Sequence, residues 1–407
     1  MLRNKVLQNQ KVLGTSEIAK QFLSVSGHVK NLGEIFKHMA LTLPKDSFPH
    51  KSVIEWWYFN GHLKDNKGRR YAFMNCLFKA DPKKTSIPLV ENIPAKEVYF
   101  SHSVFSDLNR KRVTTRTHPL SIISKDSFTK KLFFVNYIHP SLSGYVNAEI
   151  IELKPGTFKV KNEDIDLILT ARKKPFLHNG KGCFNVRKKK VFYYSYTNMK
   201  AEGTILNNGK PIEVKGKAWM DHEWAGFAGE KNWDWFSIQL DNGTEMMVQD
   251  YNNREKVYIG INPKSQKGEF TDAEKPKVSG MTGTIGVPHH DLVLIPKKEW
   301  KSPLTGAKYP VEWRIIVSSK HVDLEVSAPI KNQEVLFGSL NYWEGPIEVS
   351  GTIEGKKVRG QGFMELTGRK MEKSKIKVYE QQLKKEAEYY LDFARKEVMN
   401  YWKNRGK

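Results

Sequence analysis

The residues best suited to chemistry gather in one short segment, 219–235, which holds four of the ten tryptophans of the chain. Between these rings lie Asp221, His222, Glu223 and Asp234. Desolvation against indole surface raises the pKa of a carboxyl group, which keeps a proton available for general acid catalysis. An adjacent imidazole can accept or relay a proton near neutral pH. The segment therefore indicates acid–base chemistry; the alternative is that the rings form core and the acids are satisfied by backbone N–H groups.

Motifs for other chemistries are missing from the sequence. A carboxylate beside a large ring recurs at Glu55-Trp56 and Trp343-Glu344, but the twelve histidines and two cysteines show no HxH, HExxH or CxxC spacing. We therefore predict no metal site. Since GxSxG, GxGxxG and P-loop motifs are also missing, we predict neither a nucleophilic serine nor a nucleotide cofactor. The chemistry that remains needs no cofactor.

The elements that must position these residues are predicted to be β-strands. Apolar and polar residues alternate in runs such as 164–170 and 311–317, and turn sequences rich in Asn and Gly lie between such runs, for example 207–209 and 241–243. Asn and Gly tolerate the positive φ angles of tight hairpins. Residues 45–370 are therefore predicted to be mainly antiparallel β-structure.

The two ends of the chain show a helical pattern instead. Within 1–44, apolar residues recur with a period of about 3.6 residues, which predicts short helices. Over 376–402 they step by three and four without Gly or Pro, which predicts one long amphipathic helix. This helix either packs on the body of the protein or contacts an anionic membrane through its lysines and arginines.

An internal repeat sets the predicted architecture. Tyr194 is followed nine residues later by Gly203-Thr204-Ile205 and then by Trp219-Met220-Asp221, and Tyr342 is followed in the same way by Gly351-Thr352-Ile353 and Phe363-Met364-Glu365. Two repeat units of roughly 140–180 residues, each closing on itself, suit two β-barrels, and each barrel could hold a small ligand. The predicted units are an N-terminal helical extension at 1–44, a first barrel at 45–228, a second barrel at 229–370 and a C-terminal helix at 371–407.

These motifs resemble the AttH / carotenoid 1,2-hydratase family. The resemblance lies in Ile54-Glu55-Trp56-Trp57-Tyr58, in Trp219-Met220-Asp221-His222-Glu223-Trp224, and in Gly360-Gln361-Gly362-Phe363-Met364-Glu365, and it extends over about 45–370. It implies tandem lipocalin-like (calycin) barrels. It also implies an apolar isoprenoid, carotenoid or polyketide-like ligand near the barrel interface, and chemistry such as the hydration of double bonds.

The resemblance and the residues together give a candidate site without metal or cofactor. A carboxylic acid protonates the double bond, indoles stabilise the carbocation, and His222 orients or deprotonates water. The predicted catalytic residues are Asp221, His222, Glu223, Trp224 and Asp250. The predicted ligand-binding residues are Glu55, Trp57, His62, His102, Tyr194, Trp235, Trp343 and Glu365. The alternative is a non-catalytic carrier of a lipid or isoprenoid, in which the same rings only bury the ligand.

Composition restricts the other function classes. Of the 407 residues, 67 are Lys or Arg and 44 are Asp or Glu, giving a formal net charge of +23, but the lysines are spread away from the aromatic segments, which disfavours nucleic-acid binding. The sequence contains no apolar run long enough for a spanning helix and no secretory signal pattern. We therefore expect a cytoplasmic protein with a small apolar ligand, and peripheral contact with an anionic membrane is an additional hypothesis.

Overall fold

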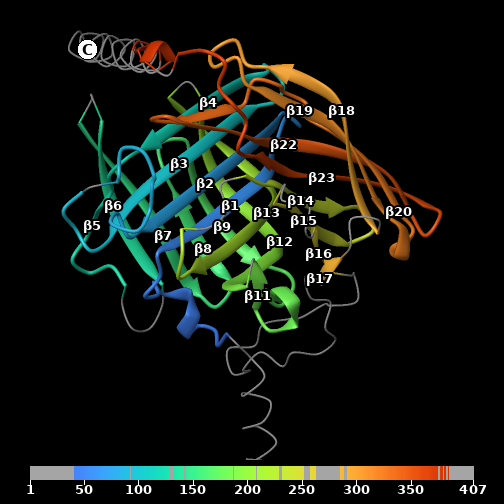
Figure 1. The fold of residues 1–407 in the computed structure, drawn as a ribbon, viewed down its shortest axis with the longest axis horizontal. Helices are drawn as coiled ribbons and strands as arrows, with labels where there is room; N and C mark the ends of the chain where they lie inside the picture. Colours follow the sequence, from blue (N-terminus) through green and yellow to red (C-terminus); the bar gives the residue numbers. More distant parts are fainter. Residues whose placement is uncertain are drawn as a thin grey trace, which may run out of the picture.

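The computed structural model describes residues 41–91, 93–128, 133–141, 144–186, 188–207, 209–228, 232–251, 257–262, 285–287, 291–374, 376–378, 380, 381 and 384. In this part of the chain the regular secondary structure is almost entirely β-strand, arranged as two curled antiparallel sheets. Figure 1 shows the first sheet in blue to green and the second in yellow to red.

The first sheet contains thirteen strands. Its path runs β4-β3-β2-β1-β13-β12-β9-β8-β7-β6-β5, and β10 and β11 both pair with β12. The strands are β1 (Ile54–Asp65), β2 (Arg70–Ala80), β3 (Val98–Asp107), β4 (Arg112–His118), β5 (Ile122–Ile123), β6 (Phe134–Ser141), β7 (Gly144–Lys154), β8 (Thr157–Lys161), β9 (Ile165–Ala171), β10 (Phe176–Leu177), β11 (Cys183–Val186), β12 (Lys189–Asn207) and β13 (Lys210–Ala225).

The second sheet contains ten strands. Its path runs β17-β16-β15-β14-β23-β22-β20-β19-β18, and β21 pairs with β22. The strands are β14 (Asp234–Leu240), β15 (Glu245–Asp250), β16 (Val257–Asn262), β17 (Ile285–Val287), β18 (Leu292–Lys301), β19 (Lys308–Val317), β20 (Val322–Ser327), β21 (Glu334–Phe337), β22 (Leu340–Ile353) and β23 (Lys356–Leu366). Three short 3-10 turns, η1 (Lys45–Ser47), η2 (His178–Gly180) and η3 (Ser318–Lys320), complete the described elements.

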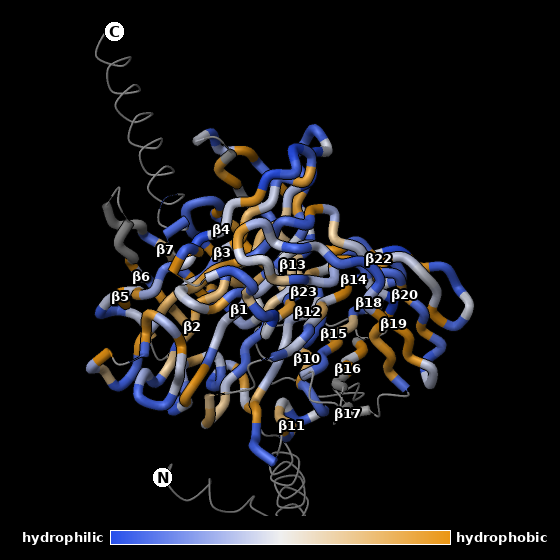
Figure 2. Tube along the Cα trace, turned by 45° about the horizontal axis from the view of Figure 1, so that its top comes forward, coloured by the Kyte–Doolittle hydropathy of each residue, from blue (hydrophilic) through white to orange (hydrophobic). Residues whose placement is uncertain are grey.

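The buried apolar residues form three layers, one of which joins the two sheets. One fills the concave face of the first sheet, one fills that of the second, and the third lies between the sheets. Successive side chains of a strand point to opposite faces of its sheet, so β1 and β13 contribute to the first layer and to the inter-sheet layer alternately. Figure 2 shows the resulting alternation of hydrophobic and hydrophilic positions along the strands.

The repeat recognised in the sequence forms the central hairpin of each sheet, β12–β13 in the first and β22–β23 in the second. A Cβ atom on Gly203 would lie 2.2 Å from the carbonyl oxygen of Asp166, and one on Gly351 would lie 2.1 Å from that of Asp323. Both glycines therefore let a neighbouring strand approach closely at the same point of each unit.

A segment before β1 packs on the concave face of the first sheet. Leu41 is buried in that layer, and the indole Nε1 of Trp57 donates a hydrogen bond of 3.1 Å to the carbonyl oxygen of Ser47. This segment, 41–53, brings the side chains of Ser47 and His50 next to residues of β1 and β13.

The observed strands confirm the predicted mainly-β antiparallel fold. The two predicted β-barrels are seen as two curled sheets, an arrangement consistent with tandem lipocalin-like domains. The division into four units stays a prediction, although the two sheets separate between Ala225 and Asp234. The predicted N-terminal helices fall mostly outside the described residues. The long C-terminal helix over 376–402 is not confirmed, because only a few of its residues are described. No helix in the described part is long and apolar enough to span a membrane.

Candidate active site

Four carboxyl side chains meet in the layer between the sheets, and we call them the inter-sheet acid cluster: Asp221, Glu223, Glu344 and Glu365. Asp221 and Glu223 are two residues apart on β13, so they share one face of the first sheet. Glu344 on β22 lies directly opposite Glu365 on β23. The charge of Asp221 acts on Glu365 of the second sheet, and the charge of Glu365 acts on Glu223 and Glu344, so the two sheets present their acids to one another.

Each sheet also supplies hydrogen-bond donors to this cluster. Trp219 Nε1 donates to Asp221 Oδ1 at 2.7 Å, and the hydroxyl of Ser195 donates to the same oxygen. Tyr58 reaches across from the first sheet, where its hydroxyl donates to Glu344 Oε1 at 2.8 Å. In the second sheet, Trp233 Nε1 donates to Glu365 Oε2 at 3.2 Å.

Burial favours the protonated form of all four carboxyl groups. Burial raises the pKa of Asp221 to about 7, even though Ser195 and Trp219 act in the opposite direction. Burial also raises the pKa of Glu365 to about 7, and it raises those of Glu223 and Glu344 well above their usual value, with neighbouring acids adding to the effect. Because the groups that donate hydrogen bonds to these acids are neutral, they offset the effect of desolvation on the pKa only in part. The layer therefore contains carboxylic acids beside indole and phenol rings at neutral pH.

Three other residues predicted for the ligand site lie in the same layer. His62 Nε2 donates to the carbonyl oxygen of Gly362 at 2.8 Å, and burial lowers the pKa of His62 to about 4. His102 Nδ1 lies 2.7 Å from the hydroxyl of Tyr342, and burial lowers its pKa to about 3. Trp235 packs in the apolar part of the layer. Both imidazoles are therefore neutral.

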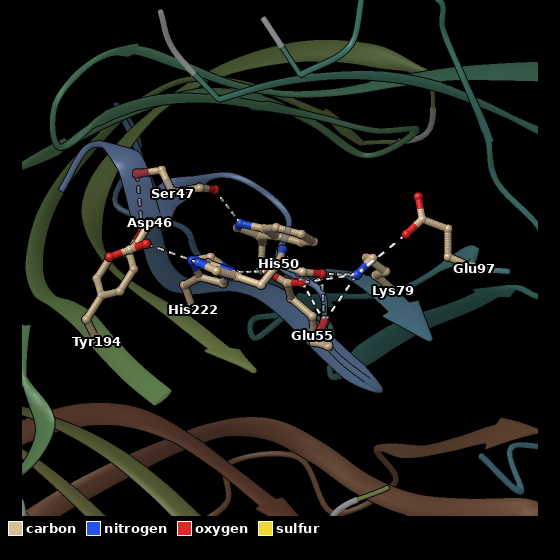
Figure 3. Close-up of polar contacts among 10 residues, drawn as sticks. Asp46, Ser47, His50, Glu55, Lys79, Glu97, Tyr194 and His222 are labelled. Carbon is tan, nitrogen blue, oxygen red and sulfur yellow. Dashed lines mark hydrogen bonds and ion pairs between the residues drawn. The ribbon is translucent and has the colours of Figure 1, made fainter. Parts of the chain in front are cut away.

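A second polar group, on the concave face of the first sheet, surrounds the carboxylate of Glu55 (Figure 3). Its Oε1 accepts hydrogen bonds from His222 Nε2 at 3.0 Å and from His50 Nδ1 at 2.8 Å. Its Oε2 accepts from Ser52 Oγ at 2.8 Å, and Lys79 Nζ lies 3.5 Å away. Burial alone would raise the pKa of Glu55, but the bonds from His222 and His50 outweigh it and lower the pKa to about 2. Glu55 is therefore an ionised carboxylate that orients His222.

Aromatic rings enclose His222 on this face. Trp57 and Trp224 each have a ring centroid 4.7 Å from that of His222, and Tyr194 meets it edge-on at 5.3 Å. His50 stacks on Trp224 at 3.7 Å. Burial lowers the pKa of His222, which Glu55 only partly offsets, so the imidazole is neutral.

Among the described residues, His50, Glu55 and His222 are the group whose donor atoms could hold a metal ion, since these atoms lie within 4.8 Å of one another. The surroundings of Glu55 fit a hydrogen-bond network better. The backbone N–H of His50 donates to both of its oxygens, at 3.2 and 2.9 Å, and the Lys79 cation lies beside it. An ion would have to displace these donors and approach a positive charge.

The structure thus distributes the predicted site residues over three layers. His222 and Trp224 face the concave side of the first sheet with Glu55, Trp57 and Tyr194, whereas Asp221 and Glu223 face the inter-sheet layer with His62, His102, Trp235 and Glu365. Trp343 is buried in the core of the second sheet. Asp250 pairs with Asp234 and shares the strand face of Met246 and Val248 in that core. The Asp-His-Glu-Trp motif at 221–224 therefore divides its side chains between two separate sites, one on each face of the first sheet.

Sequence reasoning did not assign several residues that the structure places in these groups. Glu344 could have been found from its alternation with Trp343, which puts the two on opposite faces. Tyr58 lies opposite Asp221 in the pairing of β1 with β13. Its alternation with Trp57 and Phe59 along β1 also places it on the inter-sheet face. Glu152, which is buried on the concave face of the first sheet, has no comparable signal, because it stands in an ordinary strand sequence.

Known proteins with similar sequences or structures share this architecture. The curated kievitone hydratase of Fusarium solani subsp. phaseoli is 23% identical over 221 residues, which is 51% of this chain and 57% of that protein, so the match spans little more than half the length of the relative. A crystal structure of an AttH protein from Nitrosomonas europaea matches with a TM-score of 0.59 and 22% identity, covering 81% of this chain and 97% of that one.

The crystal structure of kievitone hydratase from Nectria haematococca matches with a TM-score of 0.57 and 17% identity, covering 81% of this chain and 93% of that one. At these identities the two structures show a shared fold. The AttH-like family model matches residues 35–369, which include both sheets and both polar groups. The chain therefore belongs to the AttH-like family.

Proposed function

We propose that the protein is a hydratase-type lyase that acts on the double bond of an apolar isoprenoid or polyketide-like molecule in the inter-sheet layer. The observation that carries the proposal is the inter-sheet acid cluster, which holds buried carboxylic acids against indoles near neutral pH. The name of the fungal relative, kievitone hydratase, supports the same reaction class.

The reaction needs only side chains of this layer. The acid of Asp221 or Glu365 transfers its proton to one alkene carbon, leaving a carboxylate on the enzyme and a carbocation on the substrate. The nearby rings of Tyr58, Trp219 and Trp235 stabilise the cation through their π-faces. Water adds its oxygen to the cation and returns a proton to the carboxylate, so that one water is gained in total. Read backwards, the same steps remove water.

His222 takes no part in this sequence of steps. It lies on the opposite face of β13 from Asp221, so the water-orienting role predicted for it would require a substrate on the concave face of the first sheet. In the inter-sheet layer, the conjugate carboxylate is the base that the geometry supplies.

The test is incubation with a pool of prenylated phenols and isoprenoids in heavy-oxygen water, followed by mass spectrometry. We expect a product that has gained one labelled water. In the double variant Asp221→Asn/Glu365→Gln the rate should fall by roughly 100-fold or more, while Glu325→Gln, an exposed acid of the second sheet, should leave it unchanged. A lipid recovered bound but unaltered would support the carrier instead, and an unchanged rate in the double variant would exclude this mechanism.

A further inference from the structure

Two buried polar atoms on the concave face of the first sheet have no hydrogen-bond partner among the described residues: His222 Nδ1 on β13 and Glu152 Oε2 on β7. Both side chains are at least 99% buried. Burying such an atom without a partner costs about 1–3 kcal/mol. Such atoms therefore indicate a group that binds there, and this face is separate from the inter-sheet acid cluster.

The state of His222 follows from its other nitrogen. Glu55 is ionised and can only accept, so His222 Nε2 carries the hydrogen that it donates. Because burial keeps the ring neutral, Nδ1 carries a lone pair. This atom accepts a hydrogen bond and needs an N–H or O–H donor.

Glu152 offers complementary chemistry. Its Oε1 accepts a hydrogen bond of 3.1 Å from the backbone N–H of Gly156. Burial raises the pKa of Glu152 to about 7, so near neutral pH a large share of the molecules carry the acid form. In that form Oε2 is a hydroxyl that can donate to an oxygen, and in the ionised form it is an acceptor.

Tyr194 and Ser47 connect the two atoms. The Tyr194 ring meets the His222 ring edge-on, and its hydroxyl donates to Ser47 Oγ at 3.4 Å. Ser47 in turn forms a side-chain hydrogen bond with the Glu152 carboxyl group, which lowers the pKa of Glu152 against the larger effect of burial. Trp57 lines the same place, with its ring centroid 4.7 Å from that of His222 and 4.9 Å from that of Phe133. Aromatic walls with two polar atoms are typical of a site for a small apolar molecule with a polar end.

We propose that the concave face of the first sheet binds an apolar ligand that carries a hydroxyl group, whose O–H donates to His222 Nδ1 while Glu152 makes the second polar contact. This site goes beyond the proposed function, since β1 and β13 separate it from the inter-sheet acid cluster. It assigns to Glu152 the role of a specificity-determining residue for a hydroxyl.

The test compares three probes of matched shape by calorimetry on the full chain: 4-methylphenol, 4-methylanisole and toluene. 4-Methylphenol alone of these probes has an O–H, so we expect it to bind roughly tenfold more tightly than the other two, the value of one buried hydrogen bond. Equal affinity for the three probes, or no saturable binding of any, would overturn the proposal, with a buried water then satisfying the two atoms.

Substitutions test whether the preference for 4-methylphenol arises at this site. Glu152→Gln should reduce the preference for 4-methylphenol at least threefold and leave toluene binding unchanged, whereas Glu149→Gln, on the other face of β7, should change neither. Asp221→Asn should also leave the preference unchanged, because it alters only the inter-sheet acid cluster. If Asp221→Asn removed the preference and Glu152→Gln kept it, the phenol would be bound between the sheets and this inference would be wrong.

Discussion

At the residue scale, the donors around a buried carboxyl decide whether it is charged. Glu55 and Asp221 are both almost fully buried. Glu55 receives hydrogen bonds from two imidazoles and lies beside Lys79, whereas the donors to Asp221 are the neutral indole of Trp219 and neutral hydroxyl groups. The first is therefore an ionised orienting group and the second an acid, although both lie within two residues of a tryptophan in the sequence.

This difference predicts how stability depends on pH. The pKa of Asp221 is about 7 in the folded state and near its ordinary value of 3.8 in the unfolded state, so between these values the folded state binds more protons. Its contribution to the free energy of unfolding is full below about pH 4 and is lost as the pH rises to about 7. Glu55, whose pKa is lowered from 4.5 to about 2, contributes fully above about pH 4.5 and loses its contribution as the pH falls to about 2, so it does not change the slope between pH 5 and pH 8.

Urea unfolding at about pH 5 and about pH 8 measures this effect. We expect the wild-type protein to lose stability between the two, and Asp221→Asn to lose roughly 1–3 kcal/mol less, because an amide does not titrate. Asp323→Asn removes an exposed acid paired with Arg314 and should keep the wild-type slope. An unaltered slope in Asp221→Asn would mean that Asp221 is ionised in the folded protein.

At the element scale, the sequence shows the repeat but not the strand register of its two copies. Matching places in the two central hairpins are occupied by Gly203 and Gly351, and likewise by the acids Asp221 and Glu365. A β-bulge between Tyr196 and Met199 shifts the register of β12, and β22 has none. Tyr194 therefore faces the concave side of its sheet, while Tyr342 packs against the inter-sheet layer. One extra residue moves a side chain to the other face, and no residue type announces it.

The close approach at these glycines predicts a large effect of one methyl group. In Gly203→Ala the Cβ would meet the Asp166 carbonyl at 2.2 Å, so β9 and β12 must separate. We expect a loss of roughly 1–3 kcal/mol of unfolding free energy, measured by urea titration. Gly226→Ala is the matched control, since nothing lies within 4 Å of its Cβ position, and it should change stability by at most about 0.5 kcal/mol. Equal effects of the two substitutions would show that the strands are not held this closely.

At the scale of the whole molecule, the sequence predicts the class of fold and the acids but not which of them meet. Alternation along β13 places Asp221 and His222 on opposite faces, and this could have been deduced from the strand pattern alone. The meeting of Glu344 and Glu365 with Tyr58 depends on how the second sheet packs on the first, which is set by many apolar contacts distant in sequence. Glu152 is found only from its burial, because a single acid in an apolar strand has no pattern.

The same packing buries Lys173, although lysine is a residue type that is mostly exposed. Lys173, just after β9, places its Nζ 2.6 Å from Glu245 Oε2 of β15 and 2.8 Å from the carbonyl oxygen of Gly243 in the turn between β14 and β15. Asn198 of β12 donates to Glu245 Oε1 at 2.7 Å. Both charges are buried, so their pairing joins the two sheets in a way that exposed ion pairs do not.

Breaking this pair should therefore destabilise the whole molecule. Lys173→Met leaves the Glu245 carboxylate buried without its cation, and we expect a loss of roughly 3–5 kcal/mol in urea unfolding. Lys297→Met breaks the exposed pair with Glu325 and should cost at most about 1 kcal/mol. The double variant Lys173→Met/Glu245→Leu should regain most of the loss, because no charge then remains unpaired in the layer. If Lys173→Met behaved like Lys297→Met, water would reach Glu245 and the sheets would be joined by their apolar layer alone.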